Sequence, residues 1–210
     1  MDNAVNAYLV PTVSGAEFAV ASGAADARRA ILLGLLRGAA SRPVPLARLA
    51  ELAEIPDRKA VGALLFKMQR EGWLSGDVDP LRFPDNALAD ALPSLLAALS
   101  LHGKAVLAES NGLCIAFAGF ERPVANELAA LGAGLFPLTR RFERHLGAAI
   151  PLARAAWSLQ DGDCEARLSV RPLHIGRHLF HLILAGTLVT GSDAFLHLVA
   201  LLSRRYLGEC

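Results

Sequence analysis

The chain has 210 residues, of which 53% are hydrophobic and 20% are charged, so it holds enough apolar material for a buried core in one or two domains. Its 21 Lys and Arg residues nearly balance its 20 Asp and Glu residues, which gives a formal net charge of +1. Because binding to a polyanion requires clustered cations, this balance argues against nucleic acid as a partner of the whole chain and restricts any such contact to a local patch.

Three features of the sequence favour a reducing compartment and a cytoplasmic protein. The three cysteines stand far apart and fit neither a disulfide framework nor a zinc motif. The chain begins Met1-Asp2-Asn3, without the basic and apolar segments of a secretory signal. Its most apolar stretch, Leu179 to Val189, is interrupted by His181 and is far shorter than the roughly 20 residues that a membrane span needs. We therefore expect no membrane span.

The N-terminal segment, residues 1–24, is rich in Ala, Ser and Gly and shows no clear period. We expect a leader that forms no core of its own. Asp26 is a candidate N-cap for a first helix that ends near Gly38, because four apolar residues after it recur at helical spacing: Ile31, Leu32, Leu35 and Leu36.

Residues 25–84 contain two further predicted helices, the first ending before Pro56 and the second capped by Asp57 and closed by Gly72. A short strand at Trp73 and Leu74 and a polar loop follow. This segment resembles a winged helix-turn-helix domain in the run Leu46 to Ala53, Ile55-Pro56-Asp57, Val61 to Leu65 and Gly72-Trp73-Leu74. The resemblance implies that the third helix is the recognition element and that the loop after Trp73 is the wing.

The third helix is also the candidate DNA-binding element. Between Asp57 and Gly72 it carries four cations, Arg58, Lys59, Lys67 and Arg70, against the anions Asp57 and Glu71, a balance of 4 − 2 = +2. Gly62 and Ala63 leave this helix short of side chains that read base edges. The sequence leaves two uses open: contact with DNA, or contact with protein.

Residues 85–210 alternate helical and strand-like segments. Asp85 to Ser100 is apolar at helical spacing, with Pro93 as a possible start or kink. Two strand-like runs, Lys104 to Glu109 and Leu113 to Ala118, then flank Ser110-Asn111-Gly112, and the Asn-Gly pair favours a type I′ hairpin turn.

A long helix is predicted from Pro123 to Gly147, with Pro137 expected to kink or split it. Its apolar positions lie along one side: Val124, Leu128, Leu131, Leu135, Leu138, Phe142 and Leu146. Three strand-like runs follow, at Arg154 to Leu159, Glu165 to Arg171 and His178 to Ala185, and a last helix runs from Asp193, as N-cap, to Tyr206.

This order of elements resembles the Roadblock/dynein light chain family over about residues 86–208. The hairpin Val106-Leu107-Ala108-Glu109-Ser110-Asn111-Gly112-Leu113 stands where that family has an aliphatic strand, a polar turn and the entry to its second strand. The resemblance implies a profilin-like α+β fold, in which helices enclose a five-stranded antiparallel sheet. It also implies pairing into homodimers through a helix and a sheet edge.

The sequence contains no complete set of catalytic residues or metal ligands that we can recognise. His174, His178 and His181 would share a face on a helix, but the apolar residues around them favour a strand, which turns His178 and His181 to opposite faces. Cys114 lies in an apolar run and is interpreted as a small core residue. We expect no enzyme, no metal and no cofactor. Gly132 and Gly134 are interpreted as sites of close helix packing.

Two functions remain open. By resemblance, the first is a non-enzymatic dimeric regulator or scaffold that binds a small Ras-like GTPase or a signalling complex. Arg140, Arg141 and Arg144 are its candidate partner-binding residues, although a solvated helix face also explains such a run. The second is a winged-helix transcriptional regulator that binds DNA and uses the C-terminal domain to dimerise or to sense.

Overall fold

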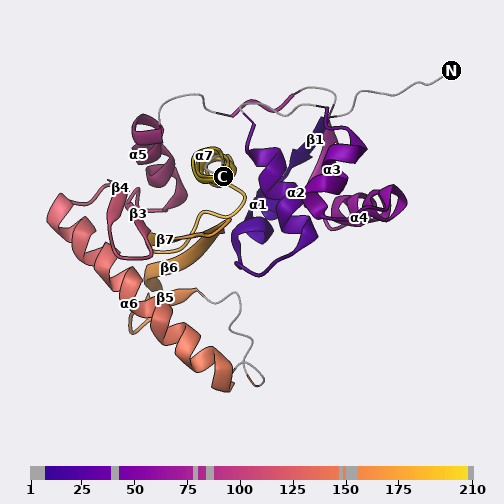
Figure 1. Ribbon diagram of the computed structural model, residues 1–210. Helices are drawn as coiled ribbons and strands as arrows, with labels where there is room; N and C mark the ends of the chain where they lie inside the picture. Colours follow the sequence, from indigo (N-terminus) through magenta and orange to yellow (C-terminus); the bar gives the residue numbers. More distant parts are fainter. Residues whose placement is uncertain are drawn as a thin grey trace. The chain divides into compact units, whose positions relative to one another are not determined.

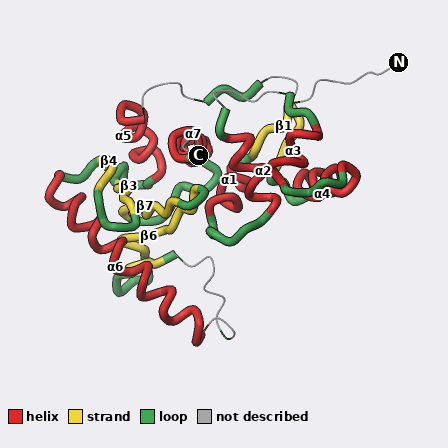
Figure 2. Tube along the Cα trace, viewed as in Figure 1, coloured by secondary structure: helices red, strands yellow, loops and turns green. Residues whose placement is uncertain are grey.

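The computed structural model describes residues 8–38, 43–77, 80–83, 88–146, 149 and 156–207. The chain divides into two units (Figures 1 and 2). The N-terminal unit comprises residues 1–20, 24–85 and 195–210, and the sheet unit comprises residues 21–23 and 86–194. The helix at the C-terminus thus groups with the N-terminal unit. The domain limits expected from the sequence, after residues 24 and 84, stay predictions.

The N-terminal segment contributes to the core, and the expectation of a coreless leader was wrong. Strand β1 (Tyr8–Pro11) pairs antiparallel with β2 (Leu74–Asp77), and helix α1 (Val13–Val20) follows it. The Phe18 ring of α1 is buried and stacks on Trp73, with the ring centroids 3.9 Å apart. These elements lack a visible period because α1 is only two turns long and is buried on most of its surface.

Three helices follow where the sequence predicts them: α2 (Ala27–Leu36), α3 (Leu46–Ala53) and α4 (Arg58–Arg70). The carboxylates of Asp26 and Asp57 accept hydrogen bonds from the backbone N–H groups of Arg28 and Lys59, so both predicted N-caps are confirmed. Glu54, in the left-handed conformation at φ 54°, ends α3 and begins the short connection to α4. Part of the predicted wing loop, residues 78, 79 and 84, lies outside the described residues.

The sheet unit confirms the predicted α+β architecture: a five-stranded antiparallel sheet in the order β4-β3-β7-β6-β5 with helices packed on it. Its strands are β3 (Ala105–Glu109), β4 (Cys114–Ala118), β5 (Trp157–Gln160), β6 (Ala166–Ile175) and β7 (His178–Ala185). Its helices are α5 (Leu88–Leu99) and α6 (Arg122–Leu146). The first residues of the predicted β5, Arg154 and Ala155, lie outside the described residues.

The two helices cover opposite faces of this sheet (Figure 1). Val106 and Ala108 of β3 pack in one apolar cluster with Ala125 and Ala129 of α6, while α5 packs against β3 and β4 from the other side. Strand β3 is buried over four of its five residues because both of its faces are covered. Helix α6 continues through Pro137 as one element, so the predicted split does not occur.

The β3–β4 hairpin forms as predicted, but its turn differs from the expected type I′. Gly112 has φ 87°, whereas Asn111 does not adopt positive φ. The Gly112 N–H donates to the Glu109 carbonyl and the Glu109 N–H to the Leu113 carbonyl, each at 2.9 Å. This is the three-residue loop in which a type I turn is followed by a left-handed glycine.

The C-terminal helix α7 spans Asp193–Tyr206 and buries eight of its residues, Phe195, Leu196, Leu198, Val199, Ala200, Leu201, Leu202 and Ser203. The backbone N–H of Ala194 donates to the Ser192 hydroxyl, so Ser192, rather than the predicted Asp193, caps its N-terminus. None of the helices in the described ranges combines the length and the apolar character needed to cross a membrane.

Candidate interaction surfaces

An apolar stripe on α6 faces solvent. Val124, Leu131, Leu138 and Phe142 are each between 42% and 45% exposed, and Leu128 and Leu135 lie between them, partly buried against the core. These six positions are spaced 4, 3, 4, 3 and 4 residues apart, which is the a/d pattern of a coiled-coil seam. We call them the α6 seam. Exposed apolar stripes of this kind mark surfaces that pack against another element.

Strand β5 forms the edge of the sheet beyond β6, and all four of its residues are exposed. Trp157 and Leu159 are 40% and 64% exposed. The indole Nε1–H of Trp157 donates to the Thr139 hydroxyl of α6 at 2.5 Å, which ties this edge to the helix that carries the seam. An edge strand with apolar side chains and one free row of backbone groups is suited to pairing with another strand.

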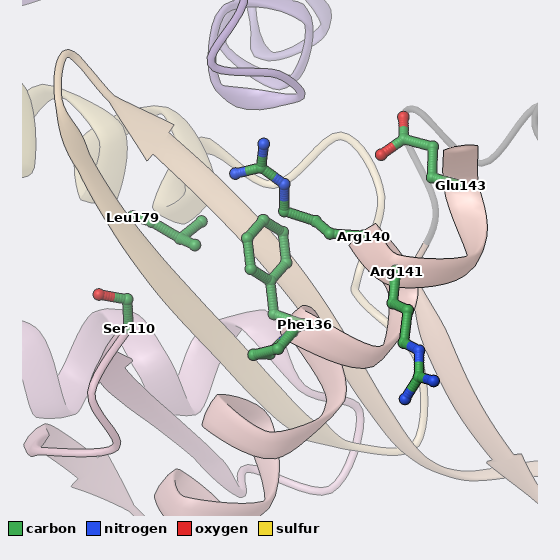
Figure 3. A pocket seen from close by; sticks show the side chains of 7 residues that line it. Ser110, Phe136, Arg140, Arg141, Glu143 and Leu179 are labelled. Carbon is green, nitrogen blue, oxygen red and sulfur yellow. The ribbon is translucent and has the colours of Figure 1, made fainter. Parts of the chain in front are cut away.

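The arginines of the distal half of α6 flank a pocket of about 630 Å³. Its lining consists of Ser110, Phe136, Pro137, Arg140, Arg141, Glu143 and Leu179, all from the sheet unit. Figure 3 shows the Phe136 ring between Leu179 and Arg140, while the guanidinium groups of Arg140 and Arg141 point in opposite directions from the helix. Neither arginine forms an ion pair within the described ranges. The side chain of Arg144, the third predicted partner-binding residue, lies outside the described side chains.

Two of the three histidines noted in the sequence, His174 and His181, contact the same residue of α6. The Phe136 ring lies 6.0 Å from the His174 ring and 5.6 Å from the His181 ring, measured between centroids. His178 belongs to the opposite face of β7 and stacks with Phe180, as the strand prediction implied. His181 is 1% exposed, and its imidazole interacts with the backbone of Glu109.

The predicted DNA-binding residues all lie on α4 and are exposed: Arg58, Lys59, Lys67 and Arg70. At 100° per residue, Lys59, Lys67 and Arg70 share the face opposite the buried Val61 and Met68, whereas Arg58 lies outside this face, closer to the buried side. Phe66 was not among the predicted binding residues, but it lies near the centre of that face and is 63% exposed. Its spacing from Lys59 and Arg70, seven and four residues, is the signal that could have identified it.

Within the described ranges, no group of three or more His, Cys, Asp and Glu residues could hold a metal ion. Cys114 is half-buried on β4, and burial raises the pKa of its thiol. A raised pKa keeps the thiol protonated, the opposite of what a nucleophilic cysteine needs. The interpretation of Cys114 as a packing residue agrees with its contact with the cluster of Val106 and Ala108.

Comparison with known proteins gives a structural likeness. No family model matches the chain, and no curated protein matches it. Among solved structures, the chain is similar to a Roadblock/LC7 domain from Streptomyces avermitilis, with 18% sequence identity and a TM-score of 0.38. The match covers 59% of this chain and 96% of that domain.

Proposed function

We propose that this chain is a non-enzymatic, homodimeric regulator or scaffold, in which a second copy packs against the α6 seam and the β5 edge. The α6 seam carries the proposal, because an exposed a/d stripe on a helix of 25 residues is complementary to a second copy of itself. Strand β5 lies within hydrogen-bonding reach of the same helix through Trp157 and Thr139, so both elements serve one interface.

The dimer is tested by the mass of the protein in solution. Light scattering after gel filtration should give about 44 kDa for the wild type, twice the chain mass of 22.2 kDa. Leu131→Glu places a charge in the seam and should yield the 22.2 kDa monomer. Asn126→Glu on the same helix is the matched control, because Asn126 is exposed and lies outside the seam. A monomeric wild type, or equal dimerisation of both variants, would contradict the proposal.

The partner class proposed for the dimer is a small Ras-like GTPase or a signalling assembly that contains one. Arg140 and Arg141, which carry no ion pair within the described residues, are the cations available to an acidic partner. We expect immobilised dimer to retain a Ras-like GTPase from a lysate of the source organism, identified by mass spectrometry, and Arg140→Glu to reduce its recovery. If the wild-type dimer retains no GTPase, this partner class is wrong, and the dimer itself is unaffected.

The second candidate is a winged-helix transcriptional regulator, and the basic face of α4 is the observation that favours it. Lys59, Lys67 and Arg70 lie exposed on one side of a helix that follows α3 after a short turn. Phe66 in the middle of this face favours protein contact instead, because an exposed aromatic ring is typical of an interface anchor.

A labelled DNA duplex distinguishes the two uses of α4. If α4 contacts phosphates, the fluorescence anisotropy of the duplex rises as protein is added, and the affinity falls steeply as the salt concentration increases. The double variant Lys67→Ala, Arg70→Ala then does not bind the duplex. If α4 contacts protein, the duplex does not bind at about 100 mM salt or binds equally to that double variant, and Phe66→Ala weakens capture of the partner.

A further inference from the structure

We propose that the pocket between α6 and the start of β7 binds an organic anion, whose acidic group contacts Arg140 and whose aromatic or aliphatic body packs on Phe136 and Leu179. The inference does not depend on the dimer. At 100° per residue, Phe136 and Arg140 lie on the flank of α6 away from the exposed seam residues Leu131, Leu138 and Phe142.

The size and apolar wall of the pocket fit an organic molecule. Its volume of about 630 Å³ falls within the roughly 300–1,000 Å³ range of small-molecule sites. Phe136, Pro137 and Leu179 provide the apolar surface, and Figure 3 shows the Phe136 ring standing between the helix and Leu179. A flat or chain-like apolar body can pack on this ring, as ligands commonly do on aromatic side chains.

The charge of the lining selects an anion. Arg140 and Arg141 stand against one acidic residue, Glu143, and the remaining polar side chain is the Ser110 hydroxyl. Neither guanidinium group is neutralised by an ion pair within the described residues, so an acidic ligand would not have to displace a protein carboxylate. Because Arg140 and Arg141 diverge in Figure 3, one acidic group meets one of them, and Arg140 is the one beside Phe136.

A buried imidazole packs against the aromatic wall of the pocket. His181 is 1% exposed, and its imidazole interacts with the backbone of Glu109. Its ring lies 5.6 Å from that of Phe136, between centroids. The Phe136 ring therefore packs between the pocket and this buried side chain.

Two fluorescent probes of nearly the same shape test the proposal on the 210-residue chain. Anilinonaphthalene sulfonate carries the anion, and phenylnaphthylamine lacks it. We expect the sulfonate to bind more tightly than the neutral probe, and Arg140→Gln to weaken the sulfonate about tenfold, an equilibrium change of about 1.4 kcal/mol. Arg122→Gln, an exposed arginine in the first turn of α6, is the matched control and should leave both affinities unchanged.

Three results would overturn the proposal. The first is equal affinity of the two probes for the wild type, and the second is equal loss of sulfonate binding in Arg140→Gln and Arg122→Gln. The third is loss of sulfonate binding in the folded Leu131→Glu variant, because the probe would then lie on the α6 seam. Retained binding in Leu131→Glu supports the pocket even if that variant is monomeric. Circular dichroism checks that each variant is folded.

Competition identifies the acidic group. Phenylbutyrate and phenyl phosphate carry a carboxylate and a phosphate on a similar aromatic body, so the stronger competitor identifies the acid that the pocket prefers. Displacement of the sulfonate probe by either compound fits the proposal. Displacement by neither, at concentrations that saturate the probe site, would contradict it.

Discussion

Gly132 of α6 lies directly against His181 of β7: a β-carbon placed on Gly132 would stand 3.2 Å from the β-carbon of His181. The His181 β-carbon is held by the backbone of a central strand, so it has little freedom to move away. The sequence-based interpretation of Gly132 as a packing glycine is therefore confirmed. The same interpretation is wrong for Gly134, because a β-carbon there would meet nothing within 4 Å.

This difference predicts opposite effects of one substitution at two neighbouring glycines. Gly134→Ala should raise the free energy of unfolding by about 0.5–1 kcal/mol, the usual gain for alanine over glycine within a helix. Gly132→Ala should lower it, because the contact with His181 outweighs that gain. Urea unfolding of the two variants measures the difference, and a stabilised Gly132→Ala would show that α6 can shift away from the sheet.

Burial of His181 predicts a loss of stability at acidic pH. Desolvation lowers the pKa of the imidazole below its ordinary value of 6.5, and the backbone of Glu109 opposes this only in part. Below pH 6.5 the unfolded chain therefore binds a proton that the folded chain resists, and stability falls as the pH falls. His181→Leu should flatten this dependence between about pH 6.5 and 5 in urea titrations. His145→Leu, the same substitution at an exposed position of α6, is the matched control.

The cap of α2 predicts a second, more acidic transition. Hydrogen bonding to the Arg28 side chain lowers the pKa of Asp26 from 3.8 to about 2. This depressed pKa stabilises the fold above pH 3.8, and the contribution is lost as the pH falls through 2. Asp26→Asn keeps a capping side chain but loses the charge, so it should lower stability at neutral pH and remove the acid dependence. Asp26→Ala also loses the capping hydrogen bond and should cost about 1 kcal/mol more. Equal stability of both variants at neutral pH would show that the cap contributes little.

The stack of Phe18 on Trp73 predicts that the same substitution has different effects on stability at Phe18 and at Phe66. The rings are inclined by 14°, and the Arg28 and Arg29 guanidinium groups each lie 5.0 Å from the centre of the Phe18 ring. Phe18→Leu removes this stack and should lower the free energy of unfolding by about 1–2 kcal/mol, with a change in tryptophan fluorescence. Phe66→Leu, the same substitution at an exposed site, should leave stability within about 0.5 kcal/mol of the wild type.

The features that could be predicted from the sequence are those set by neighbouring residues. The caps at Asp26 and Asp57 depend on a carboxylate and an N–H two residues later, and the bounds of β7 follow from an apolar run between polar ends. The β3–β4 turn shows where such reasoning stops. An Asn-Gly pair is compatible with loops of two or three residues, and the pairing of Glu109 with Leu113 decides between them.

The features that could not be predicted depend on distant segments meeting. The pocket joins Ser110, Phe136 and Leu179, which share no local pattern and are brought together by the order of the strands in the sheet. The Arg140 and Arg141 pair was visible as a charged run, but the apolar wall beside it was not. The apolar stripe of α6 was predicted, whereas its exposure was not, since periodicity alone does not distinguish a helix face that meets the core from one that meets a partner.

The pairing of β1 with β2 has a consequence for synthesis of the chain. Val10 and Ser75 are partners 65 residues apart in the sequence. At a translation rate of roughly 5–20 residues per second, the first strand is synthesised roughly 3–13 seconds before its partner. During that interval the segment has an unpaired edge and an exposed Phe18, so the nascent chain passes through a stage at which a chaperone or a second nascent chain can capture it.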